Sequence, residues 1–356
     1  AILSCSKKVA VKASDTTPGD QLNWVDTEVG PYIERAKNRA ISLALIHGDE
    51  IEYYHYGEAD RETAEVPDND HFWEIGSISK TYTAALVVAY FEAKDLNLES
   101  LVSSFLPEDF SAFHGLCAGM QVQHLLNHTS GLPRLPDDIF EEADMMDPYV
   151  HYDRDQILAF LKDYEPQSAP GEVHEYSNLG FALLGILLER HSGRSYADLL
   201  QAYVLAPMSL SNTQASTSND LRKRMVKPYL ANGVLAEYWQ MGAWIPTGGI
   251  VANLPDLAKY AQAQLPGRGA ALAHIFEQCK VPTFTESESM RIGLSWFTLT
   301  FSGQEWYFHN GGTGGFQTLL LADPQADKAM VLLSNNGFQD ESEVLGFQIF
   351  EQFVAQ

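Results

Sequence analysis

Strand-like segments lie at both ends of this 356-residue chain, and helix-like segments fill its middle. Residues 41–48 and 50–59 are typical of two strands joined by the turn signal "GDE". Strand patterns return near the C-terminus in "IGLSWFTLTF", "EWYFHN", "FQTLLLADP" and "KAMVLLSN". The hairpin-like spacing of these last strands predicts an antiparallel sheet. We therefore expect an α/β layer built from both ends of the chain, with a helical lobe inserted from Ser77 to about Lys280.

The same patterns give the expected boundaries. Residues 1–19 are polar and are predicted to be an N-terminal tail, followed by a single domain over residues 20–356. Within that domain the α/β lobe is expected at about 20–70 and 281–356, and the helical lobe at about 71–280. Further expectations concern helices and their ends: helices at about 21–39 and 340–354, caps at Asp153 and Ser195, a stop at Gly193 and a first-turn proline at Pro255.

The chain carries 47 acidic and 23 basic residues, a formal net charge of −24. Phosphate binding needs clustered Lys and Arg, so this charge argues against a nucleic-acid partner. Solubility is a sufficient explanation for the acidic surplus. The longest apolar run, Leu179 to Leu188, falls well short of the roughly 18 residues that span a bilayer, so no transmembrane helix is expected.

Three cysteines are scattered along the chain, at Cys5, Cys117 and Cys279. Their odd number and the lack of a CxxC spacing predict neither a zinc site nor a disulfide framework. The first residues, "AILSC", look like the end of a bacterial lipoprotein signal. We therefore expect an exported protein, periplasmic or lipid-anchored at Cys5. The alternative is that Cys5 belongs to a tail and that the protein is cytoplasmic.

The segment "WEIGSISKTYTAALV" places Ser77 and Lys80 at the start of an apolar helix. Residues at i and i+3 share a helix face, so the amine lies beside the serine. The helix N-terminus disfavours a protonated amine and the apolar helix desolvates it. Both effects lower the pKa of Lys80 toward that of a proton acceptor. The same Ser-x-x-Lys pattern occurs at Ser4 and Lys7, so an N-cap serine with a surface lysine is the alternative.

A second motif, "PGEVHEYSNLGFALLG", places Tyr176, Ser177 and Asn178 where a loop meets a helix. A phenol beside an ammonium group ionises more easily, and an amide offers both a donor and an acceptor. Tyr176 and Asn178 are therefore candidate site residues. The alternative is a packing tyrosine and a capping asparagine.

A third motif, "FHNGGTGGF", has four glycines in five positions after a strand. Glycines let a backbone lie close to a ligand, and backbone N–H groups exposed in this way can hold an oxyanion. A plain glycine-rich hairpin explains the pattern equally well.

Together these motifs resemble the serine β-lactamase and penicillin-binding-protein superfamily, and within it the class C β-lactamase-related branch of D,D-peptidases and family VIII esterases. The blocks "EIGSISKTYT", "HLLNHTSGLP", "PGEVHEYSNLGFALLGILLERHSG", "PTGGIVANLPDLAKY" and "FHNGGTGGFQTLLLADP" occur in the family's order. The resemblance implies an α/β (α+β) fold of the β-lactamase/transpeptidase type. That fold has a five-stranded antiparallel sheet flanked by helices and a helical lobe, with the active site between them.

The resemblance also implies a role for each site residue. Ser77 would be the acylated nucleophile, Lys80 its proton acceptor, and Tyr176 a base and then an acid. The backbone N–H groups of Ser77 and Gly312 would form the oxyanion hole. No metal or organic cofactor is implied, and the partner would be a small-molecule or peptide acyl substrate. The expected substrate-binding residues are Asn178, His309, Gly311 and Gly312.

The third motif departs from the family pattern. β-Lactamases of this branch usually have Lys-Thr-Gly or Lys-Ser-Gly where this chain has His309-Asn310-Gly311. Lysine holds a permanent charge for a substrate carboxylate, whereas histidine is mostly neutral above its usual pKa of about 6.5. We expect His309 to face the cleft and to hydrogen-bond the substrate or Tyr176, and its charged form to bind a substrate carboxylate.

The implied activity is that of a serine hydrolase acting through an acyl-enzyme, either an esterase or a D-amino-acid-type peptidase or carboxypeptidase. A class C-type β-lactamase is the alternative. A non-catalytic penicillin-binding or sensor protein is the second alternative.

Two unrelated classes of enzyme are less well supported. His124 and His128 lie at i and i+4, a spacing that can bind zinc. No Glu follows His124 and no third ligand is obvious, so packing at a helix end is the preferred interpretation. An α/β-hydrolase is disfavoured because the G-x-S-x-G elbow is missing.

Overall fold

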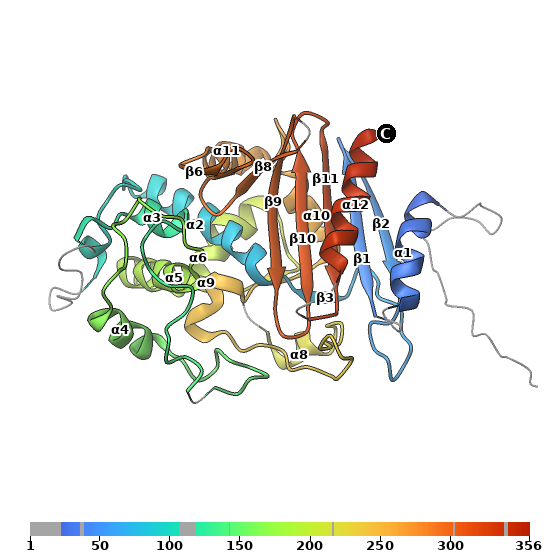
Figure 1. Ribbon diagram of the computed structural model, residues 1–356, viewed down its shortest axis with the longest axis horizontal. Helices are drawn as coiled ribbons and strands as arrows, with labels where there is room; N and C mark the ends of the chain where they lie inside the picture. Colours follow the sequence, from blue (N-terminus) through green and yellow to red (C-terminus); the bar gives the residue numbers. More distant parts are fainter. Residues whose placement is uncertain are drawn as a thin grey trace, which may run out of the picture.

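One antiparallel sheet combines strands from both ends of the chain (Figure 1). The computed structural model describes residues 23–35, 39–106, 118–141, 143–215, 217–301, 303–337 and 341–356. The predicted tail with Cys5 and the cysteine at 117 lie outside the described residues. The sheet has the order β2-β1-β11-β10-β9-β8-β7-β6. Its strands are β1 (Ile41–His47), β2 (Glu50–Tyr56), β6 (Phe284–Ser287), β7 (Met290–Ile292), β8 (Phe297–Phe301), β9 (Gln304–Gly312), β10 (Gln317–Asp323) and β11 (Lys328–Ser334).

Strand β1 lies inside this sheet, between β2 and β11. In the β1–β11 pair, Ile41 faces Ser334 and His47 faces Lys328. Strand β11 pairs in turn with β10. The first and last strands of the chain that belong to the sheet are thus direct neighbours, as the strand pattern at the two ends predicted.

The sheet has eight strands where the resemblance implied five. Strands β2, β1, β11, β10 and β9 form the expected part, and β8, β7 and β6 extend it. The segment "IGLSWFTLTF" is divided between β7 and β8, because its middle bonds to helical segments instead of to a strand. Leu294 donates its N–H to Cys279 O, and Ser295 donates its N–H to Leu126 O, both at 2.7 Å.

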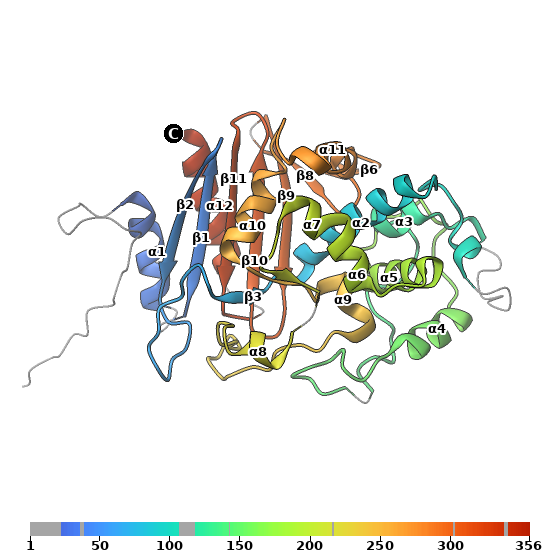
Figure 2. The same ribbon diagram turned by 180° about the vertical axis from the view of Figure 1, so that it is seen from behind.

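Helices cover both faces of the sheet and form the lobe beside it (Figures 1 and 2). The longer helices are α1 (Trp24–Arg35), α2 (Ser79–Ala93), α4 (Arg154–Asp163), α5 (Asn178–Ser192), α10 (Leu254–Gln262), α11 (Ala273–Lys280) and α12 (Ser342–Ala355). Short helices and turns are α3 (Val122–Leu126), α6 (Tyr196–Leu200), α7 (Ala206–Met208), α8 (Asn219–Arg222), α9 (Ile245–Gly248), η1 (Gly76–Ile78), η2 (Val102–Phe105), η5 (Gln201–Leu205), η6 (Gly242–Trp244) and η7 (Ala270–Leu272). Among the described residues, no helix has the length and apolar character needed to cross a membrane.

Two hydrophobic cores lie on opposite faces of the sheet. Helices α1 and α12 cover one face, and α10 packs against β11 and β1 on the other (Figures 1 and 2). Successive side chains of a strand point to opposite faces, and β10 shows the alternation. Leu319 and Leu321 belong to the core under α12, whereas Leu320 and Ala322 belong to the core that continues into the helical lobe. The sheet is therefore buried on both sides. Helix α10 packs on this sheet, although the sequence placed its residues within the helical lobe.

The predicted helix ends are confirmed. The Asp153 side chain accepts the N–H groups of the first turn of α4, and Ser195 accepts the N–H of Asp198 in α6. Gly193 ends α5 with φ +68°, a left-handed conformation that glycine adopts without strain. Pro255 lies in the first turn of α10, where its missing N–H costs nothing.

A second, small sheet was not predicted from the sequence. It has the order β3-β5-β4, with the strands β3 (Phe72–Glu74), β4 (Thr213–Gln214) and β5 (Val251–Asn253). Strands of two or three residues are too short to show an alternation of apolar and polar residues. Its strand β3 is followed directly by η1 and α2, so the pairing of β3 in this sheet fixes the start of the segment that carries Ser77.

Candidate active site

Ser77 and Lys80 come together where α2 begins. Ser77 lies in the 3-10 turn η1, which directly precedes α2, and the α-helix starts at Ser79. Lys80 Nζ lies 3.0 Å from Ser77 Oγ and donates a hydrogen bond to Thr247 O in α9 at 2.7 Å. Ser77 lines a cleft of about 420 Å³, and Lys80 is fully buried behind it. The structure thus brings together the serine and lysine that the sequence predicted.

The amine of Lys80 is in an environment that favours its neutral form. Burial lowers the pKa of Lys80 well below its usual value, and the positive charge of Arg134 lowers it further. Among the described residues, no carboxylate forms an ion pair with Lys80. The predicted shift is confirmed in direction, and burial is its largest cause.

Ser79 and Ser130 are two further serines of the sequence blocks that resemble the family. Ser79 is buried, and its Oγ accepts the N–H of Ile250 at 3.1 Å. Ser130 is buried as well, and its Oγ accepts the N–H of Leu132 at 3.3 Å. Neither lines the cleft, so Ser77 is the serine of the motifs that a substrate can reach.

Tyr176 precedes helix α5, at the loop-to-helix junction that the sequence predicted, and lines the cleft. Its ring stacks on His128 with 4.3 Å between ring centres, and Lys80 Nζ lies 4.9 Å from the ring centre. Burial raises the pKa of Tyr176, although a hydrogen bond with Ser77 and the charge of Arg134 oppose the rise. The expectation of an easily ionised phenol is therefore wrong, because desolvation outweighs the nearby positive charge of Arg134.

Asn178 is the first residue of α5 and lines the same cleft. Its Nδ2 donates to the Tyr149 hydroxyl at 3.3 Å. Its Oδ1 has no hydrogen-bond partner among the described residues. A buried amide oxygen without a partner is suited to accept an N–H group from a substrate. Its role in substrate binding stays a prediction.

The backbones of η1 and β9 meet so closely that glycine is needed on both sides. A Cβ on Gly76 would lie 2.5 Å from Gly312 N, and a Cβ on Gly311 would lie 2.2 Å from Ile75 O and 2.9 Å from Ser77 N. Gly76 also has a left-handed φ of +52°. The N–H groups of Ser77 and Gly312 thus belong to two backbone segments in direct contact. Their use as an oxyanion hole stays a prediction.

His309 lies beneath the cleft instead of on its surface, which corrects the expectation for this residue. It is fully buried, and its Nδ1 bonds to Asn310 O at 2.6 Å. Its ring centre lies 6.5 Å from that of Tyr176. Burial, followed by the charge of Lys80, lowers the pKa of His309 to about 3. The imidazole is therefore neutral near pH 7 and does not offer a charge to a substrate carboxylate.

Several cleft residues could not be predicted from the three motifs because they lie outside them. Arg134 follows the block "HLLNHTSGLP", and Gln317 follows the third motif, so each had a local hint of its position. Tyr149, Trp239 and Glu343 come from segments that only the fold brings to the same cleft as Ser77.

Residues 25–350 match the model of the family described as Beta-lactamase. The chain belongs to the beta-lactamase family. Protein flp of Staphylococcus aureus (strain MW2) is 23% identical over 324 residues, which are 89% of this chain and 63% of that protein. The chain thus spans less than two thirds of this relative. A Beta-lactamase of Escherichia coli (strain K12) is 22% identical over 377 aligned residues, which cover 96% of each chain.

Solved structures of class C beta-lactamases have the same fold. A class C beta lactamase from Rhodobacter sphaeroides superposes with a TM-score of 0.82 and 19% identity, over 94% of this chain and all of that chain. A Beta-Lactamase/D-Alanine Carboxypeptidase from Pseudomonas syringae gives a TM-score of 0.78 at 20% identity, over 92% and 97%. The predicted fold class is confirmed.

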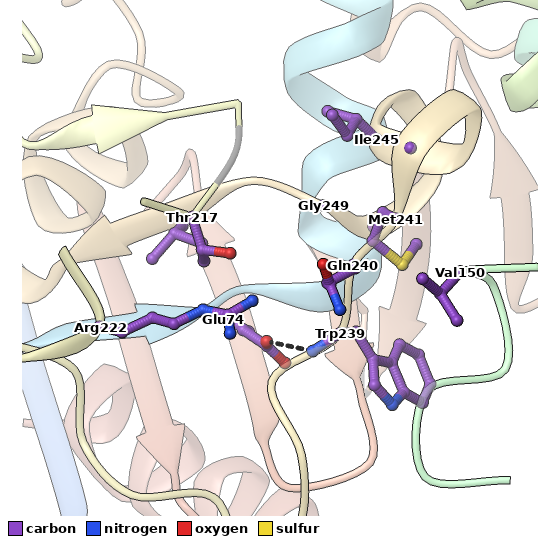
Figure 3. A pocket seen from close by; sticks show the side chains of 12 residues that line it. Glu74, Val150, Thr217, Arg222, Trp239, Gln240, Met241, Ile245 and Gly249 are labelled. Atoms are coloured by element: carbon purple, nitrogen blue, oxygen red, sulfur yellow. Dashed lines mark hydrogen bonds between the residues drawn. The ribbon is translucent and has the colours of Figure 1, made fainter. Parts of the chain in front are cut away.

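The beta-lactamase-family cleft is next to a second cavity of about 380 Å³ (Figure 3). Trp239 and Met241 line both, so this part of the chain separates them. Glu74 holds Trp239 in place by accepting its backbone N–H at 2.8 Å. Glu74 is almost fully buried, and burial raises its pKa to about 7. Arg222 points toward it from α8 (Figure 3).

The two histidines considered for zinc have separate structural contacts. His124 Nδ1 accepts the N–H of Gln121 at the start of α3, and His128 Nδ1 accepts the N–H of Ser177 at 3.0 Å. Among the described residues, no group of three or more His, Cys, Asp or Glu side chains is arranged to hold a metal ion. His128 instead supports Tyr176 by stacking on its ring.

Proposed function

We propose that this chain is a serine hydrolase that cleaves ester or amide bonds of small acyl compounds through an acyl-enzyme on Ser77. The observation that carries the proposal is the contact between Ser77 Oγ, which faces the cleft, and the buried amine of Lys80 at 3.0 Å. A serine becomes nucleophilic when a base lies within hydrogen-bond reach, and a neutral amine is such a base.

Acylation follows from this arrangement. Ser77 Oγ bonds to the substrate carbonyl carbon while Lys80 takes the hydroxyl proton. The N–H groups of Ser77 and Gly312 receive the negative charge that develops on the carbonyl oxygen. The bond to the leaving group then breaks, and the leaving oxygen or nitrogen takes the proton of the Tyr176 hydroxyl, which the raised pKa keeps protonated. Lys80 returns its proton to Tyr176, so that no net charge accumulates.

Deacylation reverses the proton path. A water molecule attacks the ester carbon while a base removes its proton, and Ser77 Oγ leaves and regains a proton. The products are a carboxylic acid and the free enzyme. Asn178 is suited to orient an amide next to the bond that is cleaved, because its buried Oδ1 lacks a partner among the described residues.

β-Lactam hydrolysis is the second candidate activity. It is favoured by the Escherichia coli relative named Beta-lactamase, which is similar over 96% of its length. The neutral His309 argues for neutral esters or amides before β-lactams, because it replaces the lysine charge that the family resemblance associates with a substrate carboxylate. A D-Ala-D-Ala peptide carries the same kind of carboxylate, so the same argument applies to it.

A substrate panel tests the proposal. The panel contains p-nitrophenyl esters of short acids, nitrocefin and a D-Ala-D-Ala peptide, measured with wild type, Ser77→Ala and Ser79→Ala. We expect turnover of at least one ester, a loss of roughly 10³-fold or more on Ser77→Ala, and a change of only a few-fold on Ser79→Ala. Equal turnover by wild type and Ser77→Ala would exclude Ser77 as the nucleophile.

A further inference from the structure

Two formally charged side chains are found among the described residues that line the Ser77 cleft: Arg134 and Glu343. Arg134 comes from the helical lobe, and its guanidinium carbon lies 5.1 Å from the ring centre of Tyr176. Glu343 comes from the first turn of α12, which packs on the large sheet. Opposite charges therefore reach the cleft from different parts of the fold.

Glu343 lines the same cleft as the reacting serine. Its Oε2 accepts a hydrogen bond from Asn310 Nδ2 at 2.9 Å. Asn310 is followed in β9 by Gly311, the residue on which an added Cβ would lie 2.9 Å from Ser77 N. Glu343 is thus hydrogen-bonded to Asn310, and the next residue, Gly311, has its backbone against Ser77. A substrate that acylates Ser77 occupies the cleft that Glu343 also lines.

The charge of Glu343 is not balanced locally. The ion pairs among the described residues involve other carboxylates. Its one described partner, Asn310, is neutral, and the neighbouring His309 is held neutral by burial. A carboxylate has about four lone-pair positions, and the amide of Asn310 occupies one. The remaining positions are available to a charged donor.

We propose that Glu343 is a specificity residue that binds a positively charged group of the substrate, an ammonium or a guanidinium. The inference rests on the proposed hydrolase function and names the class of substrate for the same cleft. The carboxylate repels substrates that carry a carboxylate at this position, and the net charge of −24 acts in the same direction over longer distances. The cleft therefore selects amine-bearing esters or amides over acidic ones.

A purely structural role for Glu343 makes a different prediction. A carboxylate in the first turn of a helix stabilises that helix through its dipole. Removing the charge would then lower the melting temperature but leave the substrate preference unchanged. Glu343→Gln distinguishes the two roles, because glutamine keeps an oxygen that accepts from Asn310 and loses the charge.

The test uses two series of matched esters. One series carries an ammonium, a methyl or a carboxylate group on the acyl chain, and the other carries the same groups on the alcohol. The control variant is Glu341→Gln, which removes the same charge at the same end of α12 from an exposed residue paired with Arg35, outside the cleft. The quantity compared is the ratio of kcat/KM for the ammonium ester to that for the neutral ester.

We expect wild type to prefer the ammonium ester in at least one series. Glu343→Gln should lower the ratio by roughly tenfold, the usual effect of one charge-assisted hydrogen bond. Glu341→Gln should leave the ratio within about twofold of wild type. An unchanged ratio in Glu343→Gln, or a wild-type preference for the carboxylate ester, would overturn the proposal.

A binding measurement separates failure of this proposal from failure of the hydrolase proposal. If wild type and Ser77→Ala hydrolyse every ester equally slowly, the hydrolase proposal is wrong. Calorimetry with Ser77→Ala and the matched amides then still tests Glu343. The ammonium amide should bind more tightly than the carboxylate amide, and the additional Glu343→Gln substitution should remove the difference. Equal binding of the two amides to Ser77→Ala would contradict the charge selection.

Discussion

Lys80 lies between Ser77 Oγ and Thr247 O, fully buried and without a described carboxylate partner. At the scale of single residues, this environment decides which group takes the first proton. Tyr176 is buried beside it with a raised pKa, so the amine is the stronger candidate for the base and the phenol for the acid. The family resemblance implied a base role both for Lys80 and for Tyr176, and the raised pKa of Tyr176 favours Lys80 as the first base.

The pH profile of the reaction tests the neutral state of Lys80. Because its pKa lies well below the usual value near 10.5, kcat/KM on a neutral ester should reach its plateau well before pH 10.5. Lys80→Arg keeps a donor for Thr247 O but cannot lose its proton, so activity should fall by roughly 10²–10⁴-fold. Lys280→Arg, at a buried lysine that does not line the cleft, is the control and should change kcat/KM little. A kcat/KM that still rises at pH 10.5 would show that the pKa of Lys80 is not lowered.

The stability of the protein should report the buried, neutral His309. An imidazole whose pKa is about 3 when folded and near 6.5 when unfolded contributes stability that is complete above pH 6.5 and is lost as pH falls toward 3. His309→Gln does not titrate. The free energy of unfolding of wild type, relative to this variant, should therefore drop by about 2–3 kcal/mol between pH 7 and pH 4.5. Urea titrations at the two pH values measure it, and parallel pH dependences would place His309 in contact with solvent.

At the scale of elements, the site depends on the contact between the turn η1 and the end of strand β9. Neither element is unusual alone. Gly76 and Gly311 let their backbones come into direct contact next to Ser77 N and Gly312 N. The third motif predicted that its glycines let a backbone lie close to a ligand, but the contact between Gly311 and the turn before Ser77 required the fold.

Gly311→Ala tests this contact. The added methyl would lie 2.2 Å from Ile75 O, so β9 must move away from η1. We expect a loss of about 1–3 kcal/mol in stability, as for other overpacked sites, and a much larger loss of kcat/KM than of substrate binding. Gly30→Ala is the matched control, because an added Cβ there meets nothing within 4 Å, and it should be neutral or slightly stabilising. Wild-type kcat/KM in Gly311→Ala would show that the close contact is not needed.

Helix ends were predicted well because they depend on neighbouring residues alone. Asp153, Gly193 and Ser195 act within one turn of their own position, so their side chains are sufficient evidence. The break between β7 and β8 and the small β3-β5-β4 sheet depend on backbone contacts with distant segments. Local sequence carries little information about such contacts.

At the scale of the whole molecule, the cleft draws on segments from Ser77 to Glu343. Three short motifs were enough to predict Ser77, Lys80, Tyr176 and the glycines, because each motif carries its own chemistry. Arg134 and Glu343 could not be found in this way. A lone Arg or Glu is a common surface residue, and only the packing of α12 on the sheet shows that Glu343 lines the same cleft as the serine.

The net charge of −24 should affect how fast charged substrates arrive. A negative molecule attracts a cationic ester, and salt screens this attraction beyond about 10 Å at 0.1 M. kcat/KM for the ammonium ester should fall severalfold between about 10 mM and 500 mM salt, whereas the neutral ester should change little. Glu343→Gln should keep part of this salt dependence, because it removes one charge of many. Equal salt dependence for both esters would exclude long-range attraction.

Covalent labelling of Ser77 is a direct test of its activation by Lys80. A fluorophosphonate probe reacts with an activated serine, and peptide mass spectrometry locates the adduct. We predict one adduct, on Ser77, formed at least roughly 10²-fold more slowly in Lys80→Arg and at the wild-type rate in Lys280→Arg. An adduct on Ser79 or Ser130, or equal labelling of Ser77 in wild type and Lys80→Arg, would contradict the activation of Ser77 by Lys80.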